Sequence, residues 1–127
     1  MQPLNLSSNV RLQHLSFYGL HFNDAWVPTY ILSTLHSVRR HSLQALVFTE
    51  PRFSTLVGLD VFFRELDGLL KDKALFDRLH SVCFYESCRG PPPGPAVSIL
   101  QSDFKAKMEV WLPHLHQRGM LVVGKEP

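Results

Sequence analysis

The stretch Leu43-Gln44-Ala45-Leu46-Val47-Phe48 carries a pattern that occurs twice more in the chain. Residues 12–17 and 79–84 repeat it as Leu-x-x-(Leu or Val)-x-Phe, and the three copies start 31 and 36 residues apart. Self-similarity over such distances is typical of proteins built from repeated supersecondary units. In each copy the last two apolar positions are two residues apart, which is the period of a β-strand. The pattern therefore predicts three strands whose last two apolar side chains point into one core.

Between these predicted strands the apolar period changes to that of a helix. Apolar residues recur mainly at steps of three or four over 26–40, and the ranges 61–72 and 101–112 carry similar stripes. This spacing predicts three amphipathic helices, each placed after one of the predicted strands.

The end of the chain predicts a fourth strand. Pro113 ends or kinks the third helix, and one more turn over 114–118 is closed by Gly119. The apolar run 120–123 follows, with strand composition. Strands that alternate with helices form parallel sheets, so the fold class is α/β.

The whole chain, 1–127, is expected to form a single domain. The segment 89–95, which is rich in Pro and Gly, is interpreted as an irregular surface loop between the third strand and the third helix. A domain boundary there would leave about 30 residues, which is too few for an independent core.

Composition excludes several classes of protein. The 127 residues are 45% hydrophobic, carry a net charge of +2 and include only two cysteines. This composition argues against a disordered tail, a disulfide-stapled scaffold and a protein whose main partner is nucleic acid. No apolar run approaches the length of a membrane span, and the N-terminus lacks the features of a signal peptide. We expect a soluble, intracellular domain with no membrane partner.

The sequence contains no catalytic constellation. It has neither a Gly-x-Ser-x-Gly nucleophile elbow nor a phosphate-binding glycine loop. Glu65 and Asp67 are expected on the solvent side of their amphipathic helix, a weak position for catalytic carboxylates. We predict that the protein is not an enzyme and has no cofactor.

Four potential zinc ligands occur in the second half of the chain. Cys83 and Cys88 are followed by His114 and His116. Cys83 lies in a predicted strand and the histidines lie beyond the Pro-rich segment, a poor placement for a tetrahedral site. We predict free cysteines and no metal.

Strand alternation predicts a binding surface on the sheet face opposite the core. On each of the first three strands, the residues between and beside the core positions point to that face. Tyr18 and Tyr85 are the strongest candidate anchors, because tyrosine is enriched in interaction hot spots. The nine predicted partner-binding residues are His14, Ser16, Tyr18, Ala45, Val47, Thr49, Ser81, Cys83 and Tyr85.

A strand with this pattern followed by a helix resembles the leucine-rich repeat, whose strand motif is Leu-x-x-Leu-x-Leu. The repeats here are longer, and the asparagine that usually follows the strand is replaced by Leu20, Pro51 and Ser87. The resemblance implies a short leucine-rich-repeat-like solenoid of about four parallel strands alternating with three helices.

Further stretches are similar to the C-terminal degenerate leucine-rich-repeat region of fungal F-box proteins. They cover most of the chain and are Trp26-Val27-Pro28, Ile31-Leu32-Ser33, Leu66-Asp67-Gly68-Leu69-Leu70, Phe76-Asp77-Arg78-Leu79, Leu112-Pro113-His114-Leu115 and Arg118-Gly119-Met120-Leu121-Val122-Val123.

In that family an F-box binds a Skp-type adaptor of a cullin ubiquitin ligase, and the repeats select the substrate. No F-box-like helical segment precedes the first repeat in this sequence. The resemblance therefore implies a substrate-recognition module with an unknown protein partner, without the adaptor contact.

A compact α/β domain that binds or is regulated by a small ligand is the alternative. Helices would then cover both sheet faces, and the ligand would sit at the carboxyl ends of the strands, among the loops 19–24, 49–54 and 86–95. The side on which the helices lie distinguishes the two hypotheses.

Overall fold

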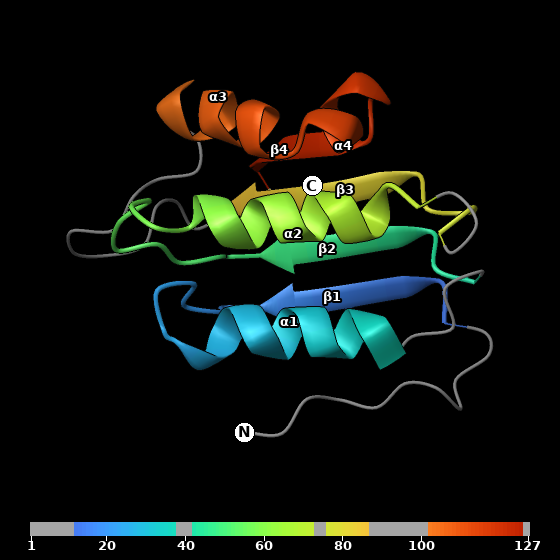
Figure 1. Ribbon diagram of the computed structural model, residues 1–127, viewed down its shortest axis with the longest axis horizontal. Helices are drawn as coiled ribbons and strands as arrows, with labels where there is room; N and C mark the ends of the chain where they lie inside the picture. The colour runs from blue at the N-terminus through green and yellow to red at the C-terminus, as the bar shows by residue number, and fades with distance from the viewer. Residues whose placement is uncertain (1–11, 38–41, 73–75, 87–101, 126–127) are drawn as a thin grey trace.

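The computed structural model describes residues 12–37, 42–72, 76–86 and 102–125 (Figure 1). Strands and helices alternate along the chain, with two helices before the last strand. In order, the elements are β1 (His14–Tyr18), α1 (Trp26–Ser37), β2 (Ala45–Thr49), α2 (Asp60–Leu70), β3 (Ser81–Glu86), α3 (Ser102–Trp111), α4 (Pro113–Gln117) and β4 (Leu121–Lys125). The predicted α/β class is confirmed.

The four strands form one sheet in the order β1-β2-β3-β4, and every neighbouring pair is parallel. Phe17, Phe48 and Phe84 stand side by side in the register of the first three strands. Equivalent positions of the repeated pattern are thus aligned across the sheet, as the pattern predicted. Each strand lies beside the one that precedes it in the chain, because each connection returns the chain by one strand spacing.

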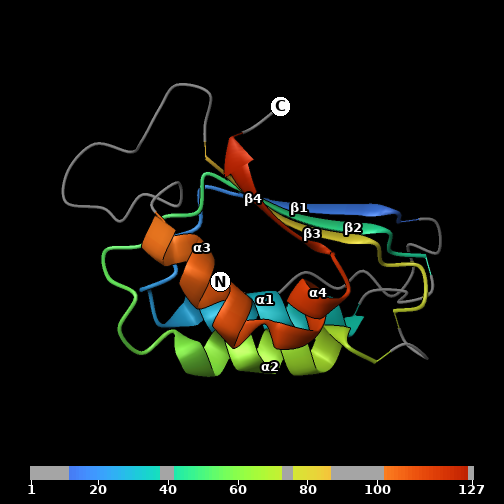
Figure 2. The same ribbon diagram turned by 90° about the horizontal axis from the view of Figure 1, so that it is seen from above.

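All four helices lie on the same side of the sheet (Figure 2). The described residues therefore form two layers, one of strands and one of helices. The arrangement with helices on both sheet faces is not found among these elements.

The third helical segment is divided, so the described residues contain four helices where three were predicted. Proline at 113 has no N–H to donate, and Leu112, with φ −120° and ψ 57°, leaves the helical conformation. The chain changes direction there, and Pro113 opens α4. The further turn expected over 114–118 corresponds to this short helix.

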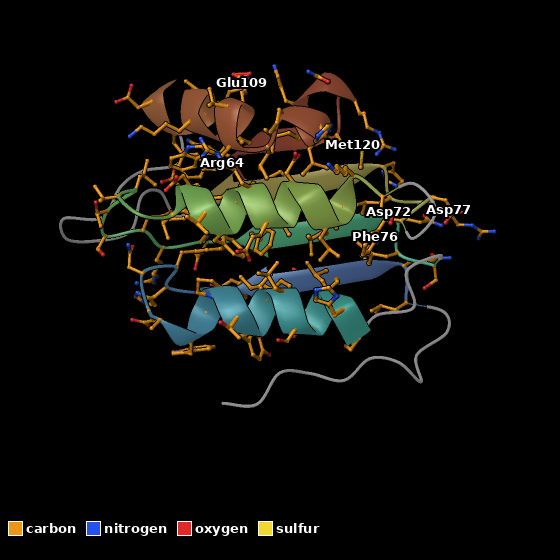
Figure 3. The ribbon with its side chains drawn as sticks, in the orientation of Figure 1. Arg64, Asp72, Phe76, Asp77, Glu109 and Met120 are labelled. Carbon is orange, nitrogen blue, oxygen red and sulfur yellow. The ribbon has the colours of Figure 1, made fainter. Side chains whose placement is uncertain are left out.

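The core lies between the two layers and is rich in stacked phenylalanine rings. Phe48 lies between Phe17 and Phe84, with ring centroids 5.5 Å and 4.9 Å away and nearly parallel planes. Phe63 of α2 meets Phe84 from the helix layer at 6.0 Å. At the amino ends of the strands, the buried side chains of Phe76 and Met120 lie beside the core (Figure 3). The repeated Phe positions thus form one continuous row across the first three strands.

The similarity between the first two repeats extends beyond the predicted strands. Phe22 and Phe53 are 31 residues apart, the same spacing as the strand patterns, and their rings stack at 4.8 Å. The Phe22 N–H donates to Arg52 O at 2.9 Å, and the Arg52 N–H donates to Leu20 O at 2.8 Å. The two segments that follow β1 and β2 therefore stack on each other as the strands do.

Asp67 is buried, with 3% of its surface exposed, so its expected position on the solvent side of α2 is wrong. Its Oδ1 accepts the Leu115 N–H at 3.1 Å, and its Oδ2 accepts the His114 N–H at 3.4 Å. These N–H groups belong to the first turn of α4, where a helix has no internal acceptors for them. Because α4 folds back onto α2, the Asp67 carboxylate fixes one helix to the other.

Candidate functional site

The candidate site is the sheet face turned away from the helices, here called the outer sheet face and defined by the nine predicted residues. The register places His14, Ala45 and Ser81 in one row, Ser16, Val47 and Cys83 in the next, and Tyr18, Thr49 and Tyr85 in the third. The structure thus brings all nine onto three adjacent strands. On β4, Val122 and Gly124 continue the second and third rows.

Exposure is uneven across this face. His14, Ser16 and Tyr18 are exposed, with 69% of Tyr18 accessible, and Val47, Ser81 and Tyr85 are half-buried. The remaining three residues are buried, which corrects the expectation that all nine face solvent: Ala45 is 3% exposed, Thr49 9% and Cys83 4%.

The buried positions share a physical cause. Each belongs to an interior strand, so that it has neighbours on both sides at about 4.8 Å. Thr49 stands between Tyr18 and Tyr85, Cys83 between Val47 and Val122, and Ala45 beside His14. A short side chain between longer ones is shielded from water. The accessible part of the outer sheet face is therefore the β1 strip together with the half-buried positions of β2 and β3.

Tyr18 and Tyr85 occupy the row nearest the carboxyl ends of the strands. They lie on β1 and β3 in register with Thr49, which places their Cα atoms about 10 Å apart, two strand spacings. Two phenol groups at this separation on one face offer apolar surface and two hydroxyl groups to a partner.

The hydroxyl group of Tyr85 interacts with the thiol of Cys83 on the same face. This hydrogen bond raises the pKa of Tyr85 above its usual value of 10.0, and burial and the charge of the Cys83 thiolate raise it further. Tyr85 therefore keeps its proton at neutral pH and can act as a hydrogen-bond donor. Cys83 itself is buried and is not part of a disulfide.

The carboxyl ends of the first two strands are joined by a side chain that the sequence analysis did not single out. Asn23 Oδ1 accepts the N–H of Ser54 at 2.8 Å and that of Thr55 at 3.4 Å, and Asn23 Nδ2 donates to Thr55 O at 3.0 Å. Asn23 and Ser54 are 31 residues apart, so the repeat spacing was the available signal. The amide that could have contacted a ligand in this loop instead links two loops of the fold.

The candidate metal ligands do not gather. His114 Nε2 lies 3.9 Å from Asp67 Oδ2, and His116 Nδ1 lies 3.4 Å from Glu109 Oε2. Within 12–37, 42–72, 76–86 and 102–125, no three His, Cys, Asp or Glu side chains are grouped so as to hold a metal ion. Cys88 lies outside the described residues, as does most of the predicted loop 89–95 and its neighbours.

None of the helices in the described part of the chain has the length and apolar character needed to cross a membrane. Comparison of the chain with protein-family models, with curated proteins and with solved structures finds no match.

Proposed function

We propose that this chain is a non-enzymatic protein-interaction module that binds a protein partner through the outer sheet face, with Tyr18 and Tyr85 as anchors. The observation that carries the proposal is the placement of every described helix on the opposite side of the sheet. That placement leaves β1 without a helix on its outer side, and Tyr18 is 69% exposed there. Extended sheet faces of this kind are the binding surfaces of many repeat proteins.

The proposal includes the nature of the array and of its partner. The stacked 31-residue spacing of Phe22 with Phe53, and of Asn23 with Ser54, favours a short leucine-rich-repeat-like solenoid. On the resemblance to fungal F-box proteins, the module selects a protein substrate inside the cell for a cullin ubiquitin ligase. The alternative, a small-ligand domain with helices on both faces, has less support because the helices lie on one side.

The test is a double variant, Tyr18→Ala with Tyr85→Ala. Loss of a hot-spot side chain costs at least about 2 kcal/mol of binding free energy, which corresponds to roughly a 30-fold weaker Kd. We expect the variant to fold normally and to recover far less of its partner in affinity purification from native cells, as measured by quantitative mass spectrometry.

The matched control is Val61→Ala with Val110→Ala. Both valines are exposed on the helix layer, at α2 and α3, so this double variant removes apolar surface from the other side of the molecule. We expect it to recover the partner as the unaltered chain does. Undiminished recovery with the tyrosine variant would remove the outer sheet face as the binding surface.

A further inference from the structure

The strand β1 lies at the edge of the sheet, and its main chain shows which groups face outward. The Ala45 N–H donates to Gln13 O at 3.0 Å, and the Gly19 N–H donates to Thr49 O at 2.9 Å. In a parallel ladder alternate residues bond to the same neighbour, so the odd-numbered residues of β1 bond to β2. The N–H and C=O groups of His14, Ser16 and Tyr18 therefore point away from β2, toward the edge.

This edge carries none of the usual devices that prevent strand addition. Natural edge strands are commonly protected by charged side chains, by proline or by bulges. Neither β1 nor α1 contains an Asp, Glu, Lys or Arg residue. By contrast, α2 and α3 each contain four charged residues, and the other edge strand, β4, ends in Lys125.

The helix α1 extends the same uncharged surface. It lies beside β1 at the same edge of the molecule (Figure 1). Its Trp26 is exposed, and the Trp26 ring meets the half-buried ring of Tyr30 at 5.5 Å. Aromatic side chains with partial exposure are typical of the buried centre of a protein interface, from which charged residues are depleted.

We propose that β1 pairs with β1 of a second copy of this chain in an antiparallel arrangement, giving a symmetric dimer with a continuous sheet. A two-fold axis requires antiparallel strands, and Ser16 is the central residue of His14–Tyr18. With the axis at Ser16, each Ser16 faces the other, and His14 faces the Tyr18 of the second copy. Each such pair exchanges two main-chain hydrogen bonds, because these are the residues whose N–H and C=O groups point outward.

Charge is the reason to choose a second copy as the occupant. A surface that carries net charge repels its own image, whereas the uncharged β1–α1 edge meets itself without like-charge repulsion. Small Ser16 side chains at the axis avoid a steric clash, and on the core side Leu15 of one copy would face Phe17 of the other. Pairing of β1 with β4 of another copy would instead bring in Lys125 and produce an open-ended array.

The experiment is sedimentation velocity of the full 127-residue chain over a concentration series. We expect the mass to rise to twice the 14.5 kDa of one chain and to stop there. A chain that stays monomeric at all concentrations, or a mass that grows beyond two copies, would overturn the proposal. So would dimerisation that appears only after removal of residues 1–11, since these residues would then occupy the edge.

Ser16→Pro tests the position of the contact. Its missing N–H points away from β2, so the β1–β2 ladder keeps its hydrogen bonds while the dimer contact loses them. We expect a folded monomer at concentrations where the unaltered chain is a dimer. Lys125→Pro is the matched control, because Val82 N–H donates to Met120 O and odd-numbered residues of β4 therefore point outward at the opposite edge. This control should remain a dimer.

A charge pair keeps the proposal testable even if Ser16→Pro disturbs folding. Ser16→Lys alone and Ser16→Glu alone place like charges opposite each other at the axis, so both should be monomers. Mixing the two variants should restore the mass of a dimer. Failure of the mixture to associate would contradict a two-fold axis at Ser16. Tyr85, on β3, lies outside this contact, so Tyr85→Ala separates partner binding from dimerisation.

Discussion

Replacing Phe48 by alanine is expected to lower the free energy of unfolding by about 3–5 kcal/mol. Phe48 is 1% exposed and belongs to an interior strand of the sheet. Its ring stacks on Phe17 and Phe84 and meets Phe22 edge-on at 5.7 Å. The substitution removes all three contacts and leaves a cavity where the strands and the segment after β1 converge.

The measurement is the midpoint of urea denaturation followed by circular dichroism. Because whole domains are stable by only about 5–15 kcal/mol, a loss of this size would unfold a large part of a marginally stable population. Phe48→Leu is the matched variant, since it keeps an apolar side chain and should lose considerably less. An unchanged midpoint for Phe48→Ala would contradict the strand register.

The second large effect is expected from Asp67→Ala, which should cost about 1–3 kcal/mol of stability. The carboxylate of Asp67 accepts two N–H groups of the first turn of α4, and alanine would leave these groups without that acceptor. Asp67→Asn keeps one side-chain oxygen and should lose less. The effect should be concentrated at α4, where amide hydrogen exchange of Leu115 is expected to accelerate.

Asp60→Ala is the control for Asp67→Ala. Asp60 lies on the same helix, and its Oδ2 is 3.7 Å from Nη1 of Arg64 in an ion pair open to solvent. Exposed pairs one helical turn apart contribute only about 0.3–0.5 kcal/mol. Equal destabilisation by Asp60→Ala and Asp67→Ala would show that the Asp67 carboxylate does not fix α4 to α2.

The strands and their register were predictable because the repeated pattern combines two independent signals. The period of two between Leu46 and Phe48 indicates a strand, and the recurrence at 31 and 36 residues aligns the strands with one another. Parallel pairing then follows from the helices between them. The same recurrence would also have identified Phe22 and Phe53, which the short pattern ended too early to include.

The positions that were wrongly predicted depend on contacts between elements far apart in the chain. The burial of Asp67 depends on the return of α4 to α2, 47 residues later in the sequence. The burial of Thr49 depends on Tyr18 and Tyr85 on the neighbouring strands. Periodicity within a single element assigns a side chain to a face, but the neighbours on that face decide whether water reaches it.

The most direct test of the interaction module is site-specific photo-crosslinking in native cells. A photo-reactive phenylalanine analogue replaces Tyr85 on the outer sheet face or, as the control, the exposed Val61 on α2. Adducts are identified by mass spectrometry, which separates a distinct partner protein from a second copy of the chain. We predict adducts with one distinct protein from position 85 and none with that protein from position 61. Adducts with a partner from position 61 alone, or no partner adduct from position 85, would contradict binding through the outer sheet face.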